Sequence, residues 1–208
     1  MKHTIDKDLA VAQRERPTTA QQLYRKSTAG EPLHDGEARR EHTHVITVVV
    51  ENSLGAFNRV TSLFSARGFN LHSVAVGATH DPDLSRMTIV TSGNDRIIGQ
   101  VVNQLDKLID TRLVVDLTEL PYVERELCLV KVTYTRETRA ELMDIIEIFR
   151  GKVVNITPDN ITVELTGPTK KVNAFVGLMA PMGIDEVARS GCIAMHRELA
   201  YEHTSNNL

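Results

Sequence analysis

The chain has 208 residues, of which 41% are hydrophobic and 25% charged, and its formal net charge is -3. This is the composition of a globular protein with one large domain or two small ones, and its charge and lack of tryptophan argue against general nucleic-acid binding. There is no basic stripe for a membrane surface, no secretory signal and no run of the roughly 20 apolar residues that span a bilayer, so we expect a cytoplasmic protein.

Residues 1–43 are polar and mixed in charge, with several prolines and glycines and no sustained apolar period. This composition predicts a mobile tail. His42 and His44 lie where the next strand begins, and imidazole is a metal ligand. A closed metal site takes four ligands, however, and we see no further ligands beside these two histidines. We therefore expect both side chains to be solvated and predict no metal site.

The stretch Val50–Val60 joins a strand pattern over residues 44–51 to a helix pattern that ends near Arg67. Asn52 and Gly55 lie at the junction, where the unpaired N–H groups of a helix start suit a carboxylate or a phosphate. Gly55 has no side chain to keep a ligand from the backbone, and the Asn52 amide can donate and accept hydrogen bonds. An ordinary turn is the simpler interpretation of these residues alone.

The next segments complete a module. Strands are predicted at 69–79, 86–91 and 112–120, and a helix follows Ser92-Gly93-Asn94 with Ile98, Val101, Val102, Leu105 and Leu108 on one face. The order is β-α-β-β-α-β, the split ferredoxin-like motif. Alternation along 69–79 places Asn70 and His72 on one face of the sheet. We expect both to be able to line the same cleft as the Asn52–Gly55 turn.

The second half repeats this order after Pro121. Strands are predicted at 127–133, 153–157, 161–166 and near 185–195, with helices at 139–149 and through Val172, Phe175, Val176 and Met179. Short matching segments, such as Phe64–Gly68 and Phe149–Gly151, support two related modules. At the position of Asn52–Gly55 the second module has Tyr134–Glu137, whose glutamate would itself occupy the anion-favouring helix end. This contrast makes the ligand-site interpretation as strong as the ordinary turn.

The sequence contains none of the catalytic motifs that we sought: a Gly-x-Ser-x-Gly elbow, a phosphate-binding loop or a His-Glu-x-x-His pair. Cys128 and Cys192 are far apart and lie in apolar runs, so we expect buried free thiols, which fit a reducing cytoplasm. RNA-recognition domains share the β-α-β-β-α-β order but expose aromatics on the third strand. Residues 86–91 contain none, which argues against RNA binding.

Several separate motifs, in order, resemble one known family. The first half carries Val50–Val60, Phe64–Asn70 and Leu84–Ile89, and the second carries Val123–Leu127, Glu147–Gly151 and Glu186–Gly191. Together these segments look like the small, regulatory subunit of acetolactate synthase, also called acetohydroxyacid synthase. The resemblance extends from His44 to Arg197 and leaves the preceding tail uncovered.

The resemblance implies an ACT domain in the first module, which pairs with a second copy to form a homodimer and binds valine or a related branched-chain amino acid at the interface. Carried over to this sequence, Asn52, Leu54, Gly55 and Ala56 would hold the ligand from one protomer. Asn70, His72 and Val76 would come from the other protomer, although His72 and Gly77 depart from the residues expected there. The catalytic subunit is a separate chain that uses thiamine diphosphate, magnesium and FAD, and no cofactor is expected in this chain.

The expected organisation is therefore a polar tail (1–43), an ACT domain (44–120), a C-terminal ferredoxin-like domain (121–200) and a polar end (201–208). The implied role is a non-catalytic subunit that activates the acetolactate synthase catalytic subunit and confers feedback inhibition by valine. The alternative is a free-standing ACT-type sensor of an amino acid or metal that regulates another partner. A transcriptional regulator of that kind would normally carry a helix-turn-helix, and the tail shows no such pattern.

Overall fold

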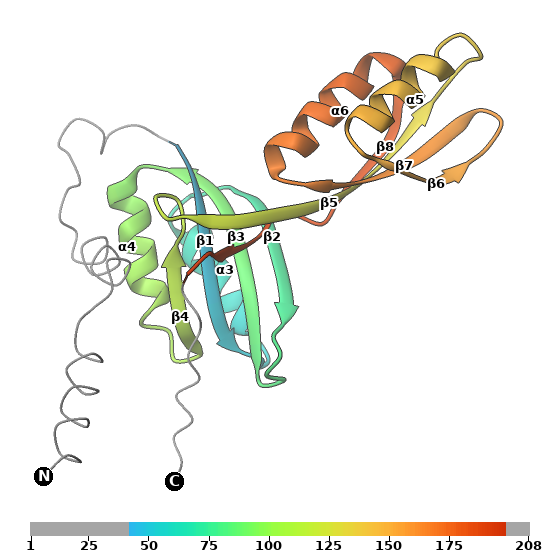
Figure 1. Cartoon of the computed structure of the whole chain (residues 1–208). Coiled ribbons are helices and arrows are strands. Elements are labelled where there is room, and N and C mark those ends of the chain that lie inside the picture. The colour runs from blue at the N-terminus through green and yellow to red at the C-terminus, as the bar shows by residue number, and fades with distance from the viewer. Residues whose placement is uncertain (1–41, 199–208) are drawn as a thin grey trace, which may run out of the picture.

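The computed structural model describes residues 42–198, which form two modules joined by one long strand (Figure 1). The first module contains β1 (His42–Glu51), α3 (Ala56–Ala66), β2 (Leu71–Ala78), β3 (Leu84–Gly93), α4 (Asp95–Leu105) and β4 (Thr111–Asp116). The second contains β5 (Tyr122–Thr133), α5 (Arg139–Ile148), β6 (Lys152–Ile156), β7 (Asn160–Gly167), α6 (Thr169–Gly183), β8 (Ile184–Arg189) and β9 (Ile193–His196). The predicted α+β fold, with two ferredoxin-like βαββαβ modules in tandem, is confirmed.

The first module is an antiparallel sheet in the order β2-β3-β1-β4. Alternate residues of β1 (Ile46, Val48 and Val50) point toward α3 and α4 and are almost completely buried. Helix-spaced residues of α3 (Val60 and Phe64) pack against them. The core thus consists of alternate residues of the strand, which share one face of the sheet, packed against residues that share one face of each helix.

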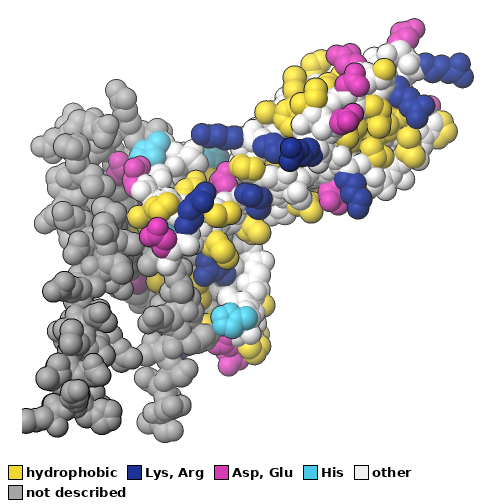
Figure 2. All heavy atoms as spheres, in the orientation of Figure 1, with side chains coloured by type: hydrophobic (Ala, Val, Ile, Leu, Met, Phe, Trp, Pro, Cys, Tyr) yellow, Lys and Arg dark blue, Asp and Glu magenta, His cyan; other side chains and the backbone are white. Residues whose placement is uncertain are grey.

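The second module repeats this arrangement with the order β6-β7-β5-β8. Its core is built from alternate residues of β5 and β7 and from one face each of α5 and α6, including Phe149 and Phe175 with ring centroids 5.5 Å apart. Hydrophobic side chains also gather on the surface of this module in Figure 2, and Met143, Ile148 and Leu178 are among those the structure exposes. These exposed side chains lie on α5 and α6.

The end of the chain differs from the single strand predicted near residues 185–195. The structure breaks that segment at Ser190–Cys192, and Gly191 adopts the left-handed φ of +79°. β8 pairs with the far half of β5, whereas β9 pairs with Tyr122–Arg125 at its near end. The reason is that β5 extends beyond the second module, so its two halves need separate partners to satisfy their backbone groups.

β9 lies against the face of the first sheet that is opposite α3 and α4. The Ala194 N–H donates to Thr88 Oγ1 at 3.2 Å, and Thr47 Oγ1 donates to the Ala194 carbonyl at 3.4 Å. A small apolar cluster fills this layer: Val45, Val115, Leu117, Cys192 and Ala194. Both faces of β1 are therefore covered, which explains why its residues from His44 to Val50 are all buried.

Other boundaries also differ from the predictions. β1 starts at His42, two residues earlier than expected, and β4 ends at Asp116, after which Leu117–Leu120 form a turn. Gly68 ends α3 with a left-handed φ of +74°, whereas in the second module the residue with positive φ after α5 is Arg150 rather than Gly151. The predicted polar segments before residue 42 and after residue 198 lie outside the described residues. Between residues 42 and 198, no helix is long and apolar enough to cross a bilayer.

Candidate functional site

The Asn52–Gly55 turn is braced from both sides. The Asn52 N–H donates to the Asp83 carbonyl at 2.7 Å, and its side-chain amide donates to the Pro82 carbonyl at 3.1 Å. On the other side, Arg59 Nε lies 2.5 Å from Asp110 Oδ2, and the same guanidinium donates to the Leu54 carbonyl at 3.3 Å. The turn is thus held in one conformation by contacts to two other loops, as a preformed site requires.

Gly55 is the N-cap of α3 and adopts the left-handed φ of +83°, where a side chain is strained. No side chain caps this helix, in contrast to α4, where Asn94 accepts from the Arg96 N–H at 2.9 Å. Within residues 42–198, the backbone N–H groups of Leu54, Gly55, Phe57 and Asn58 have no hydrogen-bond acceptor. These free donors at the positive end of the helix dipole favour an anionic group.

The surface around these donors is apolar. Leu54 is fully exposed at 101% and Phe57 is 44% exposed, whereas Ala56 is buried beneath the turn at 3%. Exposed apolar side chains next to free N–H groups are the two elements that an aliphatic amino acid requires: a wall for its side chain and donors for its carboxylate. The structure therefore allows Leu54 and Gly55 to contact a ligand directly and gives Ala56 a packing role.

The start of α5 in the second module also lacks a side-chain cap, but the residues just before it are bonded differently. Thr135 and Thr138 exchange hydrogen bonds there, with the Thr135 N–H donating to Thr138 Oγ1 at 2.9 Å and the Thr138 N–H donating to Thr135 Oγ1 at 3.3 Å. The segment that the sequence places opposite Asn52–Gly55 thus satisfies part of its own backbone. The two modules thus differ in the turn before the helix, and the sequence argument that only the first module carries a ligand site stays a prediction.

Within one chain, Asn70 and His72 do not meet the turn. His72 Nε2 lies 2.9 Å from Ser92 Oγ, and Ser92 pairs with Thr43 at the opposite end of β1 from Asn52. Nine positions along β1 correspond to about 30 Å. The Asn70 carbonyl, which accepts from Thr91 Oγ1 at 2.8 Å, lies at the same far end. The expectation that these residues line one cleft inside a single chain is therefore wrong.

The predicted alternation in β2 is also interrupted. The pairing register with β3 shifts between Leu71 and Ser73, so Leu71 and Val74 both pack toward the core below α3 and α4. His72 instead lines a cavity of about 390 Å³ between the modules, together with Glu126, Arg189 and other residues of the second module. A β-bulge of this kind redirects a side chain without a distinctive sequence signature.

A second cavity, of about 300 Å³, lies beside β9 between Arg86 and Met195. Burial lowers the pKa of the Arg86 guanidinium. Neither of these two cavities is lined by the Asn52–Gly55 turn.

The two cysteines are free and buried, as predicted. Burial raises the pKa of the Cys192 thiol to about 11, and the nearby Glu124 carboxylate adds to this. Burial likewise raises the pKa of Cys128. Both thiols are therefore protonated near neutral pH, which is the opposite of an activated nucleophile.

The histidines at the start of β1 were expected to be solvated, and for His44 this is wrong because its side chain is only 3% exposed. Its Nδ1 lies 3.0 Å from Asp116 Oδ2. Burial lowers the pKa of His44, but the hydrogen bond to Asp116 and the charges of Asp116 and Asp95 outweigh it, so the pKa is raised. Burial raises the pKa of Asp116, but the hydrogen bonds from His44 and Thr118 outweigh burial, so the pKa is lowered.

The fold defines a class: a tandem ferredoxin-like protein whose first module is an ACT domain. The family model for the acetohydroxyacid synthase (AHAS) small subunit-like ACT domain matches residues 46–112, and the model for the small subunit of acetolactate synthase matches residues 125–198. The chain belongs to the acetolactate synthase small-subunit family. It is accordingly a regulatory subunit, and its relatives imply a catalytic large subunit as its partner.

Individual relatives agree with this assignment. The acetolactate synthase small subunit of Aquifex aeolicus is 47% identical over 176 residues, which cover 84% of this chain and 90% of that protein. A probable small subunit of Archaeoglobus fulgidus is 48% identical over 154 residues, 74% of this chain and 96% of that protein. The crystal structure of the Thermotoga maritima small subunit is 37% identical, with a TM-score of 0.69, and covers 76% of this chain and 99% of that one.

Proposed function

We propose that this chain activates an acetolactate synthase catalytic subunit and confers feedback inhibition by valine. The observation that carries the proposal is the uncapped start of α3, where free backbone N–H groups adjoin the exposed Leu54 side chain. Valine has a carboxylate for the N–H groups and a short branched side chain for the apolar wall. The Asn52 side chain already donates to Pro82, so its amide oxygen remains to accept from the ligand's ammonium group.

The second half of the valine site would come from a partner protomer. β2 is an edge strand of the first sheet, and within the described residues no strand lies beyond it. Two β2 strands paired antiparallel about a two-fold axis would place the Leu71 end of one chain beside the Ala78 end of the other. Ala78 pairs with Ser85, which pairs with Val50 next to the turn. Such a dimer would bring the partner's Asn70, His72 and Val76 toward Asn52–Gly55.

The same pairing accounts for exposed surface. An unpaired edge strand is prone to aggregation unless it is covered, and Val76 on β2 is 49% exposed. Leu54 and Phe57 are exposed as well and would be covered by the partner. Valine bound between two protomers can shift the equilibrium between two arrangements of their interface, which is how a small ligand regulates a large assembly.

In this proposal the ACT domain (44–120) binds valine and forms the dimer, and the C-terminal domain (121–200) is available to contact the catalytic chain. Thiamine diphosphate, magnesium and FAD would belong to that catalytic chain, and this chain would contribute no cofactor. The complex would work in the cytoplasm, whose reducing conditions keep free thiols such as Cys128 and Cys192 reduced.

The test is reconstitution with a purified acetolactate synthase catalytic subunit, with acetolactate formation measured with and without valine. The proposal predicts that the chain raises the rate and that millimolar valine lowers it only when the chain is present. No change in rate with any catalytic subunit, combined with tight valine binding by the isolated chain, would instead support a free-standing amino-acid sensor. Valine inhibition of the catalytic subunit alone would contradict the regulatory role.

A further inference from the structure

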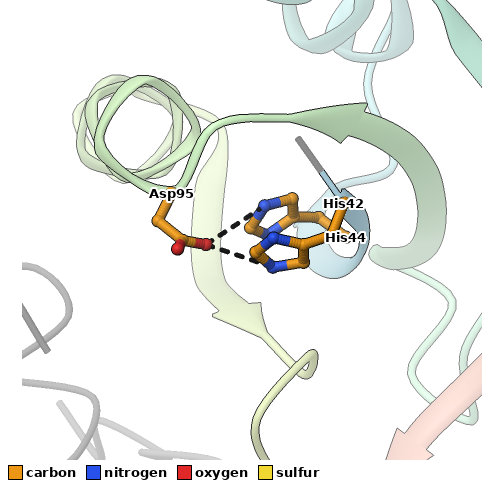
Figure 3. A group of neighbouring side chains, drawn as sticks. All are labelled: His42, His44 and Asp95. Carbon is orange, nitrogen blue, oxygen red and sulfur yellow. Dashed lines mark ion pairs between the residues drawn. The ribbon is translucent and has the colours of Figure 1, made fainter. Parts of the chain in front are cut away.

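Three side chains meet at the end of the first sheet that is far from the Asn52–Gly55 turn. His42 and His44 come from the start of β1, and Asp95 is the first residue of α4 (Figure 3). His42 Nε2 lies 3.1 Å from Asp95 Oδ1, and His44 Nε2 lies 3.4 Å from the same oxygen. The two imidazole rings are stacked with centroids 4.3 Å apart, so both Nε2 atoms face the carboxylate.

The geometry matches the spacing of metal ligands. Zinc takes nitrogen and oxygen ligands at about 2.0–2.1 Å, and tetrahedral coordination then separates neighbouring ligand atoms by roughly 3.3 Å. The two measured separations, 3.1 and 3.4 Å, bracket this value. All three candidate ligand atoms lie within 4.8 Å of one another. A small side-chain rotation would therefore suffice to close the three ligands around one ion.

The surroundings of His44 support a metal role. Its Nδ1 lies 3.0 Å from Asp116 Oδ2, and Asp116 is itself fixed by the backbone N–H of Thr118 at 3.0 Å. A carboxylate on the remote imidazole nitrogen is the usual outer-shell partner of a metal-bound histidine, because it fixes the ring and directs the Nε2 lone pair outward. His44 Nε2 is buried and makes no well-aligned hydrogen bond within the described part of the chain; its polar neighbours are Asp95 Oδ1 at 3.4 Å and the Gly93 backbone.

We propose that His42, His44 and Asp95 bind a first-row divalent cation, with zinc as the best match. Two neutral imidazoles and one carboxylate suit such ions, and a water molecule would complete four-coordination. The negative charges of Asp95 and Asp116 would balance the charge of the ion. Bound metal would connect the start of β1 to the start of α4 and, through Asp116, to the end of β4. The site is independent of valine binding.

The test measures zinc binding by isothermal titration and cobalt binding by visible absorption, on the full chain without an affinity tag. The proposal predicts one high-affinity zinc per chain, a tetrahedral cobalt spectrum and a higher melting temperature with zinc. His42→Ala and Asp95→Asn should each weaken zinc binding by more than tenfold, since each removes a ligand while both side chains are exposed enough to be replaced without unfolding. Asp116→Asn should weaken it by about 10- to 100-fold through the outer shell.

His80→Ala is the matched control, because His80 is exposed and lies outside the trio. It should leave zinc affinity and the cobalt spectrum unchanged. The proposal is overturned if the folded chain binds no zinc or cobalt. It is equally overturned if His42→Ala and Asp95→Asn bind as tightly as the unaltered chain, since the cluster would then be a hydrogen-bonded pair of imidazoles on a carboxylate.

Discussion

At the scale of single residues, the proposed valine site depends on one backbone conformation. Gly55 holds φ at +83° at the N-cap of α3, directly before the N–H groups that begin the helix. A Cβ at this position would lie 2.9 Å from Arg59 Nη1, close to the guanidinium that braces the turn through Asp110. The residue thus combines two demands, a left-handed backbone and close approach, that only glycine meets without strain.

Gly55→Asp should abolish valine inhibition while activation of the catalytic subunit survives. The new carboxylate would occupy the N–H groups that the ligand needs and would repel the ligand's own carboxylate. The variant should lose about 1–2 kcal/mol of folding stability from the left-handed backbone. Calorimetry with valine and the acetolactate assay are the two readouts.

Gly68→Asp is the matched control. Gly68 has a similar φ of +74° with no atom near its Cβ position, and it lies at the other end of α3. It should show a comparable loss of stability and an unchanged response to valine. Unchanged valine affinity in Gly55→Asp would show that the site has been placed wrongly.

The buried thiols allow a pH prediction. The pKa of Cys192 rises from 9.0 in a model thiol to about 11 in the folded chain. A raised pKa means that the unfolded state loses its proton first, so this thiol's contribution to stability is complete below about pH 9 and lost as pH rises toward 11. At pH 8 the native thiol should react with a disulfide reagent at least about a hundredfold more slowly than in the unfolded chain, from two pKa units of thiolate fraction. Fast labelling of the native protein would contradict the buried position.

Local residues were predictable where short-range chemistry decides them. Asn52 and Gly55 stand out as candidates because a strand, a turn and a helix follow one another directly in the sequence, and their role in binding valine stays a prediction. Asp95 and Asp116 were missed because strand pairing, not sequence proximity, brings them to His44, and Asp116 is 72 positions away. The sequence shows the two histidines as a pair, but it does not show that Asp95 and Asp116 lie beside them in the fold.

At the scale of elements, two features could not be predicted from the sequence pattern: the register shift in β2 and the separate strand β9. The alternation of β2 is correct over Ser73–Ala78 but shifts between Leu71 and Ser73, so His72 was assigned to the wrong neighbours. The last strand was predicted as one element near residues 185–195, although its first part carries Asp185, Glu186 and Arg189 and only its second part is apolar. Its division follows from the length of β5, which is a property of the assembled sheet.

Gly191 and Gly177 offer a test of the β8–β9 break. At Gly191 the φ is +79° and a Cβ would lie 2.6 Å from Ser73 Oγ, the atom that accepts the Cys192 N–H at 3.0 Å. Gly191→Ala should therefore cost at least about 1–2 kcal/mol. Gly177 lies in α6 with nothing near its Cβ position, so Gly177→Ala should gain up to about 1 kcal/mol.

Denaturant unfolding of both variants measures these changes. A Gly191→Ala variant as stable as the unaltered chain would mean that β9 does not dock on the first sheet as described. The paired design separates a general effect of adding a methyl group from the specific contact with Ser73.

At the scale of the whole molecule, β5 spans both modules and β9 returns the chain to the first sheet (Figure 1). At the base of the second module, Glu126 of β5 is only 4% exposed and forms two hydrogen bonds of 2.7 Å with Arg189 of β8. The modules are connected through β5 and through the hydrogen bonds of Ala194 on β9 to Thr47 and Thr88, so a change at the first module can reach the second along these contacts. The tandem architecture was predictable from the repeated β-α-β-β-α-β order, whereas this connection depends on contacts far apart in the chain.

The central claim is that each valine site is shared between two protomers, and mixing two inactive variants tests it most directly. Gly55→Asp disables the turn and Asn70→Ala disables the opposite strand, so neither homodimer should bind valine, while size-exclusion chromatography shows that both still dimerise. After subunit exchange, each mixed dimer has one site with both halves intact. Random exchange should then restore about a quarter of the unaltered binding capacity in calorimetry, because contacts across a two-fold interface are reciprocal. No recovery of valine binding in the mixture would show that the site is not built from two chains.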